Sequence, residues 1–291
     1  MLFTIEHTTE YRFNRPVFFE PHHLRFCPRT DGSQQVVQFD LQIDPAPAGC
    51  TQAFDAEGNL ETLAWFNDIH DHMTIRATAE VETLRDNPYD FVLGPTAVRL
   101  PVGYQPRELA LLAPAMKRSA VPIYVDPSRE LAEQLRQASR GEVVPFLSRL
   151  TETISHRFKR VHRENGTPWP PATTIEQRQG ACRDLAVLWV DICRSVGLAA
   201  RFVSGYFEGL ANREKHYLHA WGEVYLPGAG WRGFDPTNGL AVSDRHVAVA
   251  ASADPQFASP VTATYRGNNV AAELTADVIV ERQSAVALLA C

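Results

Sequence analysis

A cysteine at the predicted start of a helix is the residue of this chain best suited to chemistry. Residues 179–184 read QGACRD, and the apolar residues after Cys182 recur at helical spacing up to Gly197. The free N–H groups and the positive dipole end of a helix N-terminus stabilise a thiolate relative to a thiol. Cys182 is therefore a candidate nucleophile. Cys193 lies deep in the same apolar stretch and is expected in the core.

A predicted β-hairpin supplies the partners that a nucleophilic thiol needs. Residues 219–226 alternate in polarity from His219 onward, and the turn PGAG at 227–230 returns the chain into a second strand at 231–235. With Leu226 opposite Trp231, His219 would lie opposite Asn238, and Asp235 would be three residues away along the partner strand. The hairpin therefore nominates either Asp235 or Asn238 as the group that orients His219.

These residue types together indicate acyl transfer. A thiolate attacks a carbonyl carbon, an imidazole exchanges protons with it, and a carboxylate or amide fixes the tautomer of the imidazole. The backbone N–H of Cys182 could be one donor to the oxyanion that forms during attack. Gln177 and Gln179 are candidates for a second donor through their side-chain amides, but their spacing places neither of them.

The elements that must position these residues fall into two regions. Alternating apolar residues predict strands near 3–7, 37–43 and 73–81, separated by turn residues at 31–32, 45–47 and 57–59. Helices are predicted at 126–140 and 143–158. We therefore predict an α+β protein with an antiparallel β-sandwich-like domain at 1–100, a proline-rich connecting segment at 101–122 and a catalytic core at 123–291.

The composition excludes several classes of function. The formal net charge of −6 and the absence of a basic run give no electrostatic footprint for nucleic acid. No apolar run is long enough to cross a membrane, and the first residues lack the pattern of a targeting segment, which predicts a cytoplasmic protein. Five scattered cysteines argue against a disulfide framework or a zinc site.

Two histidine-containing runs and one acidic turn are further candidate metal ligands. The runs His70-Asp71-His72 and His22-His23 offer no third metal ligand, and the acidic turn at 55–59 is too short for a helix-loop-helix calcium site. We expect neither a metal nor a cofactor. His216 is expected at the rim of the site with Tyr217, because it lies three positions from His219 on an extended chain. Two tryptophans, Trp221 and Trp231, are expected in the core or in a cleft wall.

Four ordered motifs carry a resemblance to a known family. They are GACRD at 180–184, ARFVSGY at 200–206, HAW at 219–221 and GFDPTN at 233–238; Tyr11, the pair at 28–29 and the turn at 55–59 extend the likeness to the β-rich part. The chain resembles the bacterial transglutaminase-like proteins. The resemblance implies a papain-like core, in which a cysteine-bearing helix packs on an antiparallel sheet. It also implies that Cys182 is the nucleophile, His219 the general base and acid, and Asp235, rather than Asn238, the orienting group.

The expected function is a cysteine-dependent hydrolase or acyltransferase. Cys182 would attack an amide of a peptide or protein substrate and form a thioester, and water is the default acceptor, as in a peptidase or amidase. A protein-glutamine transglutaminase would use the same triad and pass the acyl group to an amine. A binding or scaffold module with little turnover is the alternative from another class, because one fold hosts many functions.

Overall fold

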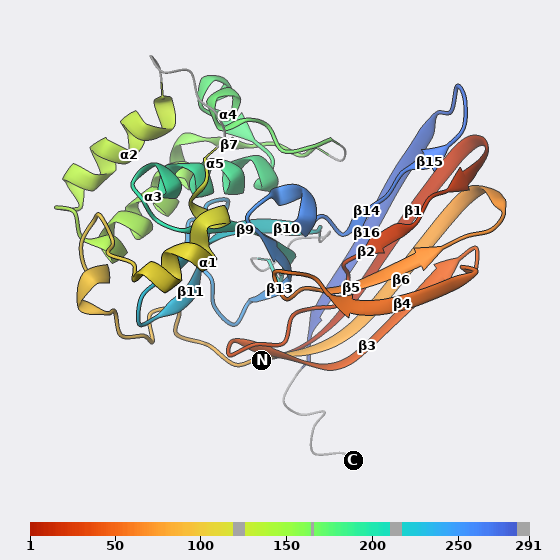
Figure 1. Cartoon of the computed structure of the whole chain (residues 1–291), viewed down its shortest axis with the longest axis horizontal. Coiled ribbons are helices and arrows are strands. Elements are labelled where there is room, and N and C mark those ends of the chain that lie inside the picture. Colours follow the sequence, from red (N-terminus) through yellow and green to blue (C-terminus); the bar gives the residue numbers. More distant parts are fainter. Residues whose placement is uncertain (119–125, 164–165, 210–216, 284–291) are drawn as a thin grey trace.

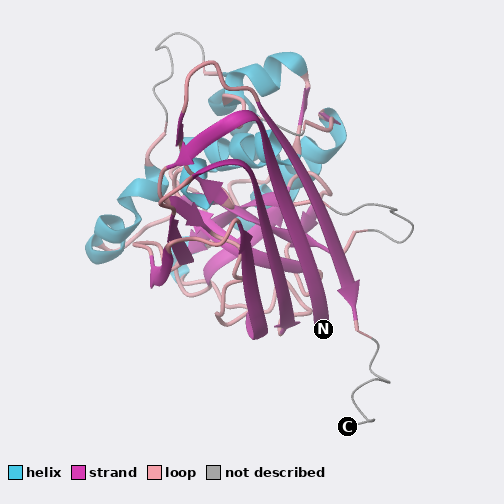
Figure 2. Ribbon diagram, turned by 90° about the vertical axis from the view of Figure 1, so that its right-hand side faces the viewer, coloured by secondary structure: helices cyan, strands magenta, loops and turns pink. Residues whose placement is uncertain are grey.

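The computed structural model describes residues 1–118, 126–163, 166–209 and 217–283. Helices gather around one sheet, and long strands form a separate, elongated β region beside it (Figure 1). Figure 2 shows the long strands of this region running side by side along one flank of the molecule. The fold is α+β, as the sequence predicts.

The β region consists of two antiparallel sheets. Alternate residues of the long strands are buried, and apolar side chains from both sheets, including Phe19, Leu24, Phe66 and Met73, form the core between them. The first sheet contains β1 (Leu2–Phe19), β3 (Gln34–Asp44), β6 (Ile69–Thr83), β15 (Tyr265–Arg266) and β16 (Ala272–Arg282). The second sheet contains β2 (His22–Leu24), β4 (Gly49–Phe54), β5 (Leu60–Trp65) and β14 (Val261–Thr262).

The last strands of the described chain return to this β region. Strand β16 pairs with β1 continuously, from Phe3 opposite Arg282 to Phe13 opposite Ala272. Strands β14 and β15 likewise pair with β2 and β1. The sequence assigns residues 123–291 to the core, but these pairings join the last strands to the β region. We therefore propose that residues 261–282 belong to the β region. The predicted boundary at 122/123 lies outside the described residues.

The second region is a five-stranded antiparallel sheet covered by helices. Its strands run in the order β12-β11-β10-β9-β13, with β9 (Ala200–Phe207), β10 (His219–Leu226), β11 (Gly230–Asp235), β12 (Leu240–Ala241) and β13 (His246–Ser252). Helix α5 (Cys182–Ser195) packs on β10 and β9, and the ring of Trp189 lies so close to Gly222 that a Cβ there would be 2.2 Å from it. Helices α2 (Pro127–Ala138) and α3 (Val143–Arg157) complete the layer.

Two helices lie outside the segments for which the sequence predicts helices. Helix α1 (Pro106–Met116) occupies the proline-rich connecting segment, and α4 (Pro171–Gln177) occupies the polar segment before the cysteine. Both begin with proline at the first helical position, where no N–H is needed. Shorter elements are β7 (Lys159–Arg160), β8 (Gln179–Gly180) and the 3-10 turns η1 (Pro95–Ala97) and η2 (Pro255–Ala258). No helix in the described parts of the chain is both long and apolar enough to span a bilayer.

An apolar seam joins the two regions. Phe3 and Ile5 on β1 pack with Tyr206 on β9 and Val247 on β13, and all four side chains are fully buried. The β region therefore packs against strands β9 and β13 of the core sheet.

Candidate active site

Cys182 is the first residue of α5, as predicted from the sequence. A buried carboxylate fixes this helix start: Asp184 accepts hydrogen bonds from the backbone N–H groups of Ala181 and Trp169, each at 2.7 Å, and from Arg163 at 3.0 Å. Only glycine fits at position 180, because a Cβ there would lie 2.8 Å from that of Asp184. The local sequence thus holds the cysteine at the dipole end of the helix.

His219 begins β10, and the hairpin that follows has a register one residue away from the predicted one. Leu226 pairs with Gly230, not with Trp231, because three residues rather than four form the turn. This change brings Asp235 to the same face of the sheet as His219, as a diagonal neighbour. The Nε2 atom of His219 lies 2.8 Å from Oδ2 of Asp235.

Asp235 is fully buried, and both of its carboxylate oxygens accept hydrogen bonds. Its Oδ1 accepts the backbone N–H groups of Thr237 at 2.9 Å and Asn238 at 3.2 Å. Its Oδ2 accepts the side-chain amide of Asn238 at 2.6 Å in addition to His219. The amide nitrogen of Asn238 is 3.4 Å from the same imidazole nitrogen. The geometry therefore favours Asp235 as the partner of His219 and gives Asn238 the role of a donor to that carboxylate.

A second imidazole, which the sequence analysis did not single out, contacts the same carboxylate. His246, the first residue of β13, is buried, and its Nε2 lies 3.3 Å from Oδ2 of Asp235. Burial lowers the pKa of His246 even though Asp235 acts in the opposite direction, so the ring is neutral and donates Nε2–H. No local sequence pattern predicts a role for this residue, because it lies in an apolar strand. It contacts Asp235 only because β13 and β11 belong to the same sheet.

The charges of the site favour a thiolate paired with an imidazolium. Burial alone raises the pKa of the Cys182 thiol, but the hydrogen bond and charge of His219, with Arg160 and Arg183, outweigh it and lower that pKa. Burial opposes the charged form of His219 as well, yet Asp235 and Cys182 raise its pKa to about 10. The Cys182 sulfur lies 4.0 Å from the carbonyl oxygen of the residue before His219.

The buried carboxylate is the anion that balances this pair. Burial raises the pKa of Asp235, but the charge and hydrogen bond of His219, and then those of His246, hold it well below its usual range. Because Nε2 of His219 is bonded to Asp235, Nδ1 is the ring nitrogen left for the sulfur. A thiolate, an imidazolium and an orienting carboxylate are the groups required for nucleophilic attack on an acyl carbon.

Other predicted residues lie apart from this cluster. Gln177 is exposed at the end of α4, and Gln179 lies in the short strand β8; neither makes a hydrogen bond with a described residue through its side chain. Cys193 is buried in the core, where burial raises the pKa of its thiol well above the usual value. His216 lies outside the described residues, and Tyr217 packs against His162 with ring centroids 4.6 Å apart.

Trp221 and Trp231 lie on the face of the sheet that carries His219. Trp221 is fully buried, and the guanidinium of Arg201 lies over the ring of Trp231 at 4.1 Å. In the parts of the chain that the structure describes, no group of three or more His, Cys, Asp or Glu side chains is arranged to hold a metal ion.

A cysteine at the start of a helix, packed on an antiparallel sheet that carries a histidine and an aspartate, defines a papain-like core. The comparisons with known proteins place this core in a family: residues 129–236 match the transglutaminase-like superfamily, and residues 3–82 match the bacterial transglutaminase-like N-terminal region. Both regions of the chain therefore match parts of bacterial transglutaminase-like proteins, and the fold is the transglutaminase-like one.

Individual relatives match over nearly the whole length. An uncharacterized protein of Mycobacterium tuberculosis is 28% identical over 305 residues, which cover 95% of this chain and 92% of the relative. One of Mycobacterium leprae is 24% identical and covers 95% and 96%. The crystal structure of a candidate cysteine protease from Cytophaga hutchinsonii superposes with a TM-score of 0.68 at 19% identity, covering 98% of this chain and 92% of that one. This last likeness establishes the shared fold.

Proposed function

We propose that this protein is a thiol-dependent enzyme that cleaves an amide bond of a peptide or protein. Cys182 is the nucleophile, His219 the general base and acid, and Asp235 the group that orients the imidazole. The observation that carries the proposal is the buried contact of His219 with Asp235 at 2.8 Å beside a thiol whose pKa is lowered. A structural cysteine would show the opposite shift, as the buried Cys193 does.

The residues present account for each step of the reaction. The Cys182 thiolate adds to the carbonyl carbon, and the carbonyl electron pair moves to oxygen, which the N–H of Cys182 is positioned to meet. As the C–N bond breaks, the His219 imidazolium protonates the leaving amine and a thioester remains. His219 then takes a proton from water, and the hydroxide oxygen adds to the thioester. Breaking the C–S bond releases the acid and restores the Cys182 thiolate beside the His219 imidazolium.

Iodoacetamide alkylation tests whether Cys182 is activated. The unperturbed thiol pKa is about 8.5, so each unit by which it is lowered raises the thiolate fraction about tenfold at pH ~6. We expect Cys182 to be labelled at this pH faster than a free thiol. Cys50 is exposed and is an internal comparison within the same chain, and peptide mass spectrometry separates the two sites. Equal labelling of Cys182 and a free thiol contradicts the proposal.

The acyl acceptor is tested separately. Purified protein is incubated with a peptide library and with glutamine-containing proteins, with and without an added primary amine, and the products are identified by mass spectrometry. We expect cleavage or deamidation that does not require the amine, is lost in Cys182→Ala and persists in Cys50→Ala. Incorporation of the amine in preference to water would instead identify a transglutaminase. No turnover with any substrate, together with unactivated Cys182, would favour a binding module.

A further inference from the structure

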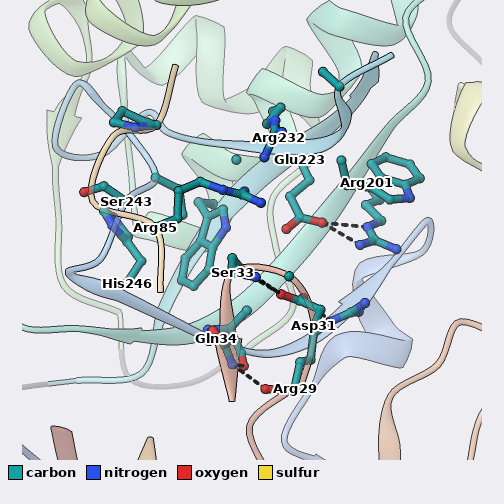
Figure 3. A pocket seen from close by; sticks show the side chains of 18 residues that line it. Arg29, Asp31, Ser33, Gln34, Arg85, Arg201, Glu223, Arg232, Ser243 and His246 are labelled. Atoms are coloured by element: carbon teal, nitrogen blue, oxygen red, sulfur yellow. Dashed lines mark hydrogen bonds and ion pairs between the residues drawn. The ribbon is translucent and has the colours of Figure 1, made fainter. Parts of the chain in front are cut away.

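A polar cavity of about 260 Å³ lies where the β region covers the core sheet. Figure 3 shows its lining side chains entering from both regions. Arg29 and Asp31 come from the segment between β2 and β3, Gln34 begins β3, and Arg85 follows β6. The core sheet contributes the opposite wall, with Arg201, Trp221, Glu223, Trp231, Arg232, Gly233 and His246.

The cavity adjoins the candidate active site on one face of the sheet. Side chains two apart on a strand share a face, so His219, Trp221 and Glu223 follow one another along β10. The first of these pairs with Asp235, and the next two line the cavity. His246 belongs to both places, because its Nε2 meets Asp235 and its ring forms part of the cavity wall.

The side chains that line the cavity carry more positive than negative charge. Four arginines line the cavity, Arg29, Arg85, Arg201 and Arg232, against the two carboxylates Asp31 and Glu223. This local excess of two positive charges (four minus two) contrasts with the net charge of −6 of the whole chain.

Both carboxylates of the wall are already engaged. Glu223 accepts Nε of Arg201 at 2.8 Å and also pairs with its NH2 nitrogen at 2.6 Å. Asp31 lies 3.7 Å from Arg29 and accepts the backbone N–H and the hydroxyl of Ser33. Arg85 and Arg232 are therefore the arginines of the wall that its carboxylates leave unbalanced.

Arg85 and Arg232 extend into the same part of the cavity (Figure 3). Neither forms an ion pair or donates a side-chain hydrogen bond to any described residue, and the Nε of Arg232 is buried without a partner. Burial lowers the pKa of Arg232, and repulsion by Arg85 lowers it further and exceeds the opposing attraction of Asp90. Two guanidinium groups that enter the same part of a cavity form a favourable site for an anion with several oxygens.

Two further polar atoms of the wall lack partners. Trp221 is fully buried, and its indole N–H has no acceptor among the described residues. The Nδ1 of His246 is also buried without a partner, but as the acceptor nitrogen of a neutral ring it offers no proton to an anion. Buried polar groups of this kind are costly unless something bonds to them, and an indole N–H can donate only to an acceptor.

We propose that this cavity binds a small oxyanion, a phosphate or a compact carboxylate, between the guanidinium groups of Arg85 and Arg232, with the indole N–H of Trp221 as a further donor. The volume suits such a ligand, since a water molecule takes up about 30 Å³ of liquid, and it is too small for a length of folded peptide. The site is separate from Cys182 and does not depend on the proposed enzymatic activity.

Isothermal titration calorimetry of the full chain in a phosphate-free, low-salt buffer tests the proposal. Inorganic phosphate and malate are titrated in separate experiments, which identifies the oxyanion that binds better. We expect saturable binding of at least one of them to the wild type. Binding should be weakened at least tenfold in Arg85→Gln and in Arg232→Gln. It should be weakened several-fold in Trp221→Phe, which keeps an aromatic side chain and loses the indole N–H.

Two matched variants separate this site from general charge and from the active site. Arg149→Gln removes one positive charge from an exposed position of α3 and should bind as the wild type does. Cys182→Ala should also bind normally, so the result is independent of turnover. Circular dichroism confirms that each variant is folded. No saturable binding, or equal binding by the wild type and both cavity arginine variants, would overturn the proposal.

Discussion

Replacing Asp235 by asparagine removes the charge on which the proposed site depends while keeping the shape of the side chain. Oδ2 of Asp235 meets three nitrogens, those of His219 at 2.8 Å, Asn238 at 2.6 Å and His246 at 3.3 Å, and Oδ1 meets two backbone N–H groups. The single oxygen of an asparagine can serve one of these sets. The donors of the other set are buried, and they lose their acceptor.

The loss of stability in Asp235→Asn follows from the number of buried donors that lose their acceptor. At least two buried donors are left without an acceptor, at about 1–3 kcal/mol each, so Asp235→Asn should lower the free energy of unfolding by about 2–6 kcal/mol. The protein should still fold, because domains are stable by about 5–15 kcal/mol. The pKa of His219, held at about 10 chiefly by Asp235 against its burial, should fall. Turnover should decrease about 10²–10⁴-fold.

The assay is the pH dependence of Cys182 alkylation, followed by mass spectrometry. In the wild type the rate rises through the lowered pKa of the thiol, and the thiolate–imidazolium pair persists until His219 loses its proton near pH 10. In Asp235→Asn the midpoint should move to higher pH, because the imidazolium that stabilises the thiolate is lost. Asp68→Asn, at an exposed position, is the matched control. An unchanged midpoint in Asp235→Asn would refute the coupling of the three groups.

His246→Phe removes a donor to Asp235 and should lower kcat about tenfold at unchanged KM, with partial recovery in His246→Gln; equal kcat in all three proteins argues against a positioning role. Asp184→Ala removes the acceptor of three hydrogen bonds and should cost about 3–5 kcal/mol in urea unfolding; a loss below about 1 kcal/mol contradicts this. Gly222→Ala places a Cβ 2.2 Å from a buried indole ring and should cost about 1–3 kcal/mol, whereas Gly32→Ala has open space and should unfold like the wild type.

The sequence predicted those features that depend on neighbouring residues. The start of α5 at Cys182 and its end before Gly197 follow from local apolar spacing and helix-end chemistry, and the structure has both. Helix α1 was missed because Pro106 and Pro114 suggested irregular chain, although the first occupies the one helical position that suits proline.

The features that depend on distant residues were not predictable in the same way. The hairpin register was wrong by one residue, because the number of residues in a turn that contains two glycines is not fixed by their types alone. His246 lies in an apolar strand and becomes a partner of Asp235 only when β13 joins the far edge of the sheet beside β9. The cavity arginines come from two separate strands and two connecting segments, so no motif links them.

The pairing of β16 with β1 has a consequence for how the chain acquires its structure. Strand β1 is synthesised before the core, but its neighbour along residues 3–13, β16, is made only after the core. Domains generally fold in the order of synthesis. The edge of β1 that later pairs with β16 therefore has unpaired backbone groups while the core folds. Contacts of such long sequence separation slow folding. The stage at greatest risk of aggregation is therefore the one before β16 is made, when the core is folded and β1 still lacks this partner.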